Sequence, residues 1–299
     1  MNSHPENYTK TNWEDRMKKM FWRLALILMA LLISTGTGFA GSSTLDEIMA
    51  AKTLVVSTDA NYAPQSFLND KGELEGFDVS VAKEVAKRLG VKVKFITPDW
   101  ELITAGKWGK RWDLSIGSMT PTAERKNALL FTMPYYSSPA QFAVHSKNKD
   151  IKTVADLAGK TIGIASETTN ERYLQKDLKI EDVTIVYQDW SAGELKNYPT
   201  DANHIEDLSL GDGLRLDAVF TSRQTLAEAI RSGCGKGCPI KMVGEPPYYE
   251  PLCFALDKSR PNSQSFVDKL NEILKSMYDD GTLVKLSEQF YGTNLIPKL

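Results

Sequence analysis

Residues 77–96, FDVSVAKEVAKRLGVKVKFI, predict a helix over 77–89 that leads directly into a strand. The apolar residues of the first part share one helical face: Val79, Ala82, Val85, Ala86 and Leu89. Asp78 is expected to cap the start of this helix, and Gly90 is expected to end it. The strand follows at residues 91–96.

The same alternation of short apolar runs and amphipathic stretches continues on both sides of this unit. Strands are predicted at residues 53–57, 112–116, 160–165, 183–187, 217–221 and 240–243, and closing helices at 266–277 and 282–290. This order is typical of βα units around parallel sheets, so we expect an α/β fold.

Two segments are expected to cross between two sets of strands. One is residues 142–151, where a strand runs into a polar stretch, and the other is residues 244–249, rich in proline and tyrosine. Two crossings imply that one lobe is inserted into the other. We assign residues 41–142 and 246–299 to the first lobe and 143–245 to the second. The cleft between two lobes is a usual place for a ligand.

The N-terminal residues 1–40 resemble an export signal and are left out of the fold. A basic region around Arg16 and Arg23 precedes an unbroken apolar run, 24–33, which is too short for a membrane span of about 20 residues. Small residues follow, and cleavage is predicted after Ala40. A retained anchor is the alternative, and Met17 is a second possible start.

The formal net charge of −2 gives no argument for binding nucleic acid or an acidic membrane surface. The three cysteines lie late in the chain. Cys234 and Cys238 flank a flexible Gly-Lys-Gly, and export to an oxidising compartment favours a disulfide between them over a metal site. Cys253 lies in an apolar stretch and is predicted to be a buried free thiol.

Residues 116–125, IGSMTPTAER, carry the most informative polar pattern. Thr120 is expected to cap a helix that starts at Pro121, and free N–H groups at such a start favour an anion. Ser118 adds a hydroxyl donor. Arg125, one turn in, can hold a carboxylate in a bidentate fork. The alternative is an ordinary capped helix with a solvated arginine.

Two further segments are expected to face the same cleft. After the strand at 160–165, Thr168 and Thr169 stand where a helix would begin, so each lobe offers a helix start with hydroxyl donors. After the first strand, Asp59 can pair with a positive group and Tyr62 can offer its ring, unless this segment is only a proline-containing turn. Trp100 is expected to line the pocket.

Several motifs in a fixed order make this chain resemble the polar amino acid-binding proteins of bacterial ABC importers, solute-binding protein family 3. They are TDANYAP at 58–64, GELEGFD at 72–78, GSMT at 117–120, Glu124-Arg125, PYY at 134–136, DLAGK at 156–160, Thr168-Thr169 and DAVF at 217–220. The resemblance covers about residues 46–292. It implies a two-lobed periplasmic-binding-protein (Venus flytrap) fold with two crossover strands.

The resemblance also implies a role for each matching residue. Arg125 would bind the α-carboxylate of the ligand, Tyr62 would stack on the ligand, and Asp59 would meet a cationic side chain. Supporting contacts would come from Gly117, Ser118, Thr120 and Thr169. The protein would be a monomer that delivers its solute to an ABC importer permease in the inner membrane.

One departure from the family concerns the α-ammonium. The family usually places an aspartate two residues after the DAVF strand, where this chain has Ser222. A serine hydroxyl accepts a hydrogen bond but supplies no charge. Either Glu167 or Glu250 replaces the aspartate, or the ligand lacks an ordinary α-ammonium. The identity of the solute stays open.

An enzyme of the same fold is the competing interpretation, because periplasmic dehydratases that act on cyclic phenylalanine precursors resemble these binders. A buried Glu167 or Glu250 could act as a general acid. The sequence shows no nucleophile elbow, metal-ligand set or cofactor loop, so we assign no catalytic residue, metal or cofactor. A sensory input domain is the third class considered.

Overall fold

The computed structural model describes residues 17, 18, 20, 42–232 and 239–298. The chain divides into two compact units, Met1–Ser42 and Ser43–Leu299, and the fold below is that of the second unit. Most of the predicted signal segment, its cleavage position and the pair Cys234 and Cys238 lie outside the described residues. Among the residues described, no helix is long and apolar enough to cross a membrane.

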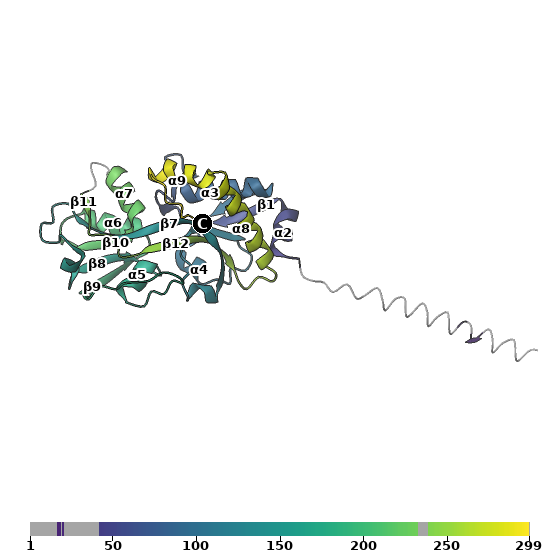
Figure 1. The fold of residues 1–299 in the computed structure, drawn as a ribbon, viewed down its shortest axis with the longest axis horizontal. Coiled ribbons are helices and arrows are strands. Elements are labelled where there is room, and N and C mark those ends of the chain that lie inside the picture. The colour runs from purple at the N-terminus through teal and green to yellow at the C-terminus, as the bar shows by residue number, and fades with distance from the viewer. Residues whose placement is uncertain (1–16, 19, 21–41, 233–238, 299) are drawn as a thin grey trace, which may run out of the picture. The chain divides into compact units, whose positions relative to one another are not determined.

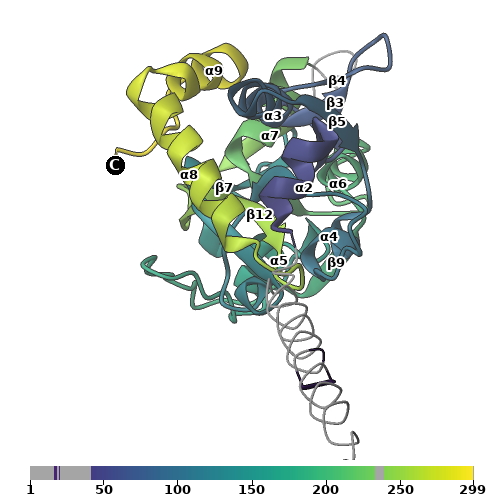
Figure 2. The ribbon, with the colours of Figure 1, turned by 90° about the vertical axis from the view of Figure 1, so that its right-hand side faces the viewer.

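The elements of the first lobe begin with helix α2 (Thr44–Ala51) and end with helices α8 (Gln264–Asp279) and α9 (Thr282–Tyr291). Between them lie β1 (Thr53–Ser57), β2 (Asn61–Tyr62), β3 (Ser66–Leu68), β4 (Leu74–Glu75), α3 (Phe77–Leu89), β5 (Lys92–Ile96), α4 (Trp100–Thr104), β6 (Leu114–Met119) and the 3-10 turn η1 (Arg125–Asn127). Strand β1 pairs in parallel with β5 and β6, as the βα pattern predicts. Helices α3, α8 and α9 pack together (Figure 2).

The second lobe holds η2 (Val154–Leu157), β8 (Thr161–Ala165), α5 (Thr169–Leu174), β9 (Glu194–Tyr198), α6 (Asp201–Ser209), β10 (Ala218–Ser222), α7 (Arg223–Ser232) and β11 (Ile240–Val243). Strand β8 pairs in parallel with β9 and β10. Each lobe has its own apolar core. The first is built around Leu54 and Phe254, and the second around Ile162 and Phe220.

Two long strands join the lobes: β7 (Leu129–His145) and β12 (Tyr249–Asp257). Strand β7 pairs with β12 up to Pro139 and with β10 from Ala140 onward, so one continuous strand belongs to both sheets. The strand order is β5-β1-β6-β12-β7-β10-β8-β9, with β11 also on β7. Figure 1 shows β7 and β12 running between the two groups of elements. The α/β fold with two crossover strands is therefore confirmed.

Two local predictions are wrong. Residues 183–187 form no strand, although Val183, Ile185 and Tyr187 alternate as a strand would. Their apolar side chains pack on the second core, and the hydroxyl of Tyr187 donates to the carbonyl of Leu178 at 2.8 Å. The place in the sheet beside β8 is taken instead by β9.

Asp78 does not cap helix α3. The position before the helix is Gly76, and Asp78 is fully buried. Gly76 has φ of 128°, a conformation that residues with a Cβ rarely adopt, and a Cβ there would overlap the carbonyl oxygen of Gln65. Gly90 ends the helix in the left-handed conformation, as predicted.

We expect Gly76→Ala to lower the free energy of unfolding by at least about 3 kcal/mol, because backbone strain and overlap with the main chain of residue 65 add together. Gly72→Ala is the control, since Gly72 also has positive φ, 75°, but no atom within 4 Å of its Cβ position. That control should lose only about 1 kcal/mol in urea unfolding. Equal losses would contradict the close packing at Gly76.

Candidate functional site

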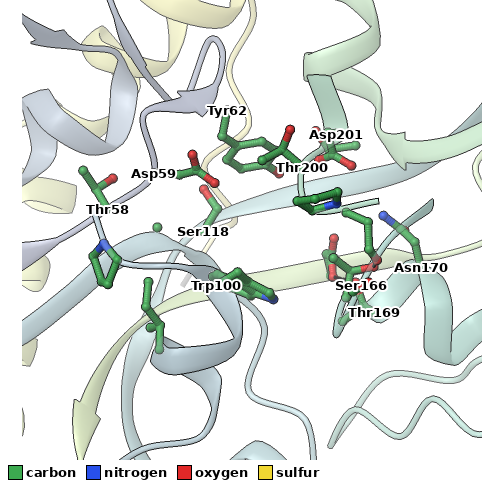
Figure 3. A pocket seen from close by; sticks show the side chains of 18 of the residues that line it. Thr58, Asp59, Tyr62, Trp100, Ser118, Ser166, Thr169, Asn170, Thr200 and Asp201 are labelled. Carbon is green, nitrogen blue, oxygen red and sulfur yellow. Dashed lines mark hydrogen bonds between the residues drawn. The ribbon is translucent and has the colours of Figure 1, made fainter. Parts of the chain in front are cut away.

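A cavity lined by residues of both lobes lies between them (Figure 3). Nine of the ten predicted site residues line it: Asp59, Tyr62, Trp100, Gly117, Ser118, Arg125, Thr168, Thr169 and Ser222. The tenth, Thr120, is buried behind the cavity wall. The structure therefore brings together residues that are up to 163 positions apart in the chain.

The lobes touch across this cavity. The indole of Trp100 and the guanidinium of Arg125, both from the first lobe, donate to the carbonyl of Glu167 in the second, at 3.1 and 2.7 Å. Nearby, Arg172 forms an ion pair with Glu124 of the other lobe at 3.0 Å. These contacts give the molecule a closed form in which the cavity is bounded on both sides.

Arg125 is the one cationic side chain that lines the cavity, all of whose lining residues are described. It is only 8% exposed, and its guanidinium lies over the ring of Trp100 at 5.1 Å. Burial lowers the pKa of Arg125 to about 10, so the group stays charged at neutral pH. Among the described residues no carboxylate oxygen lies within 4.0 Å of it. A buried charge without an ionic partner is costly, and a ligand carboxylate would supply that partner.

The predicted helix at Thr120 and Pro121 is wrong. The chain turns there and forms only the three-residue η1, because the N–H of Ala123 is held by the carbonyl of Lys179 in the second lobe at 3.2 Å. The hydroxyl of Thr122, not Thr120, accepts from the backbone of Arg125. The anion site predicted on the first lobe therefore has its guanidinium but no helix start.

The predicted helix start on the second lobe is confirmed. Thr168 caps α5 by accepting from the N–H of Glu171, and its own hydroxyl donates to the carbonyl of Ala165 at 2.7 Å. Its hydroxyl is thus fully used within the cap. Thr169 follows as the first helical residue and points its hydroxyl elsewhere.

Glu250 lies on β12, one of the two strands that join the lobes, and accepts hydrogen bonds from a hydroxyl group of each lobe. Its Oε2 accepts from Thr120 at 2.5 Å and from Thr169 at 2.7 Å. Burial raises the pKa of Glu250, whereas the two hydroxyls and the charge of Arg125 act in the opposite direction. Of the two glutamates considered from the sequence, Glu250 lines the cavity, and Glu167 instead has its side chain half-exposed beside Arg172.

The remaining predicted residues differ in whether their polar side-chain atoms already have hydrogen-bond partners within the protein. Asp59 Oδ1 accepts from the N–H of Asn61 at 2.7 Å, and burial, followed by the charge of Asp201, raises the pKa of Asp59. Ser118 donates to Asp78 at 2.7 Å. Ser222 accepts from Gln65 of the other lobe at 3.2 Å. These two hydroxyls are therefore already engaged inside the protein.

Sequence reasoning missed the contribution of helix α6. Thr200 and Asp201 line the cavity, and so does Asn170 of α5 (Figure 3). Thr200 caps α6, so that Asp201, its first residue, stands at the edge of the cavity. The predictions above place no helix here, yet the threonine cap followed by Ile205 and Leu208 on one face is a usable helix signal.

Residues 54–293 match the model of the bacterial extracellular solute-binding proteins, family 3. The chain belongs to this family. Among its relatives in the family, the L-cystine-binding protein TcyJ of Escherichia coli is 29% identical over 272 residues, 90% of this chain and 94% of that protein. ABC transporter arginine-binding protein 1 of the same organism is 29% identical over 267 residues, 89% and 98% of the two chains.

A solved structure shows the same family 3 fold. It is an ancestral amino acid-binding protein described as a precursor of cyclohexadienyl dehydratase, with a TM-score of 0.69 and 31% identity. The match covers 84% of this chain and 100% of that one. Both the predicted family and the predicted fold are therefore confirmed.

The buried carboxyl group of Asp78, to which Ser118 donates, predicts that the stability of the fold depends on pH. Burial raises the pKa of Asp78 to about 7, although Tyr135 and Ser118 donate to it. The folded state then holds this proton more tightly than the unfolded state. The contribution of Asp78 to stability is therefore full below about pH 4 and is lost as the pH rises to about 7, by up to about 4 kcal/mol.

The measurement compares urea unfolding of the wild type with that of Asp78→Asn between pH 4 and 7. Asparagine cannot titrate, so the stability of the variant relative to the wild type should increase over this interval. A constant difference between the two proteins would mean that Asp78 is ionised throughout and has no raised pKa.

Proposed function

We propose that this protein is the extracytoplasmic solute-binding component of an ABC importer and that it binds an amino acid between its lobes. One observation carries the proposal: the buried guanidinium of Arg125 faces the cavity with no carboxylate within ion-pair distance among the described residues. The names of the two relatives, which bind L-cystine and arginine, support an amino acid as the ligand class.

Binding would begin on the first lobe, where the carboxylate of the ligand meets Arg125 in the open form. The second lobe would then close by bending at β7 and β12, bringing Glu167, Thr168 and Thr169 toward the ligand. Closure removes water, and ionic hydrogen bonds are stronger in the dry site that results. The closed form is the one that a permease would recognise.

The setting of this activity is part of the proposal. A signal-like N-terminal segment and membership of an extracellular family support export to the periplasm, and the name of one relative supports an ABC permease as the partner. We propose that the protein acts there as a monomer, since the cavity is completed by the two lobes of a single chain.

A dehydratase is the second candidate, because Glu250 is buried in the cavity with a raised pKa and could donate a proton. One structural neighbour is a precursor of such an enzyme but is itself described as an amino acid-binding protein. Incubation with prephenate or arogenate tests this candidate. Formation of an aromatic product that is lost in Glu250→Gln would establish an enzyme.

Arg125→Ala should weaken binding of the natural amino acid at least about 30-fold, because truncating one partner of a buried charge pair costs about 2–5 kcal/mol. Isothermal titration calorimetry against a panel of amino acids measures this. Arg111→Ala is the matched control, since Arg111 is an exposed arginine of the same lobe outside the cavity. Unchanged affinity in Arg125→Ala would remove Arg125 from the site.

A further inference from the structure

Asp78 is a buried carboxyl group that the proposed binding mode does not use. It lies on α3, is fully buried and does not itself line the cavity. Its Oδ2 accepts from the hydroxyl of Ser118 at 2.7 Å, and its Oδ1 accepts from that of Tyr135 at 2.6 Å. Ser118 does line the cavity (Figure 3). Asp78 is therefore connected to the cavity through the hydroxyl of Ser118.

The same group of side chains holds the backbone of Ser118. Its N–H donates to the hydroxyl of Tyr135 at 3.1 Å, and its Oγ lies 2.6 Å from the hydroxyl of Tyr136. Ser118 has φ of 54°, in the left-handed region that residues with a Cβ rarely adopt. Such a conformation persists only where the surrounding contacts fix it. Asp78 and the two tyrosines thus set the place of the Ser118 hydroxyl at the cavity wall.

The hydroxyl of Ser118 has one hydrogen, and the charge of Asp78 decides where that hydrogen points. An ionised carboxylate only accepts, so Ser118 and Tyr135 both donate to it, and Tyr136 donates to Ser118. Ser118 then presents an oxygen without a hydrogen to the cavity. A protonated Asp78 has a hydrogen of its own. If that hydrogen is donated to Ser118, the serine hydrogen becomes available to the cavity.

We propose that Asp78 is a positioning residue that switches Ser118 between acceptor and donor, so that binding of a ligand carboxylate is coupled to uptake of one proton by Asp78. This inference rests on the proposed function, because it takes a carboxylate to enter the cavity that Ser118 shares with Arg125. The proton comes from the solvent and binds to the carboxylate of Asp78.

Two effects of the ligand act in the same direction. A ligand carboxylate only accepts hydrogen bonds, so it favours the state in which Ser118 donates. Its negative charge also opposes a second negative charge on Asp78 behind the cavity wall. Each effect raises the pKa of Asp78 when the ligand binds.

The surroundings of Asp78 leave its proton exchangeable near neutral pH. Burial raises the pKa of Asp78 to about 7. In the part of the chain that the structure describes, no lysine, arginine or histidine nitrogen lies within 4.0 Å of its carboxylate. The titratable groups whose pKa responds to its charge are tyrosines of β2, β7 and α9. Burial raises the pKa of each, so all stay neutral between pH 6 and 8: Tyr62, Tyr135, Tyr136 and Tyr291.

Linkage fixes the sign of the pH dependence. Because the bound form holds the proton more tightly than the free form, affinity is highest below pH 7 and falls as the pH rises through 7. If the ligand binds the protonated form about tenfold more tightly, the dissociation constant rises about fivefold from pH 6 to 8, and about 0.4 proton is taken up per ligand at pH 7. Arg125 stays charged over this range.

The test is isothermal titration calorimetry on the full exported protein, freed of bound solute by unfolding and refolding. The first probes are L-cystine and L-arginine, the solutes in the names of the two relatives, followed by the other standard amino acids except histidine and cysteine, whose side chains titrate in or near this range. Titrations at pH 7 in phosphate and in Tris, whose heats of ionisation differ, give the number of protons taken up. Titrations at pH 6 and 8 give the change in dissociation constant.

Asp78→Asn should remove this proton uptake and keep the affinity near that of the wild type at pH 6. Its amide can donate to Ser118 as the protonated acid would, and its oxygen still accepts from Tyr135. Burial also raises the pKa of Asp59 and Glu250 at the cavity, so the difference in uptake between wild type and variant, about 0.4 proton, isolates Asp78.

Two further variants complete the test. Glu73→Gln is the matched control, because Glu73 is an exposed acid of the same lobe and its replacement changes the net charge equally. It should take up as many protons as the wild type. Ser118→Ala retains Asp78 but has no hydroxyl to switch, so its uptake should be less than half that of the wild type.

The inference is overturned, and the proposed function kept, if an amino acid binds but wild type and Asp78→Asn show the same proton uptake and the same pH profile of affinity. If Asp78→Asn does not fold, Ser118→Ala decides, and an uptake equal to that of the wild type overturns the inference. Absence of binding to every amino acid of the panel would overturn both.

Discussion

The buried positive charge of Arg125 is the interaction on which the closed molecule depends. Its guanidinium is held by the carbonyl of Thr120 in its own lobe and by that of Glu167 in the other, with the ring of Trp100 beneath it. Glu167 accepts from both Arg125 and Trp100 while holding φ of 59°, which is uncommon for a residue with a Cβ. A single group therefore faces the cavity and ties the lobes together.

Five hydroxyl groups at the cavity or behind its wall are already engaged inside the protein, whereas the hydroxyl of Thr58 is buried without a partner among the described residues. Thr168 completes a helix cap, Ser118 supports Asp78, and Ser222 contacts Gln65. Thr120 and Thr169 share one oxygen of Glu250. The guanidinium of Arg125, in contrast, has no carboxylate oxygen within 4.0 Å among the described residues. In the proposed binding mode, the charge of Arg125 would therefore contribute more to recognition than the neutral hydroxyl donors.

Sequence patterns predicted regular elements well where the spacing of apolar residues and the end signals agreed. Helix α3 has the predicted bounds, and strands β1 and β11 do as well, because apolar periodicity and a glycine stop are local properties. In residues 183–187, apolar and polar side chains alternate as in a strand, but the segment pairs with no strand. Such alternation indicates which side chains are buried and does not show that the backbone forms sheet hydrogen bonds.

The sequence predicted which residues line the cavity better than it predicted the contacts between them. Motif order identified nine lining residues, but not that Thr120 would donate to Glu250, a residue 130 positions away. The turn at Thr120 depends on a backbone contact with Lys179 of the other lobe, which no local pattern encodes. Asp201 was missed for the same reason: its helix is recognisable, but its approach to Asp59 exists only in the folded chain.

Strand β7 passes without interruption from one sheet to the other, exchanging β12 for β10 at Pro139 and Ala140. In the proposed closure, β7 would bend at this point through changes of its dihedral angles, which have a broad allowed region, while its extended backbone keeps its length. Small rotations about the backbone bonds at Pro139 and Ala140 would turn the second lobe relative to the first. Strands β8 and β9 lie farthest from β7 in the second sheet, so they would move farther in the proposed closure than the residues next to the bend.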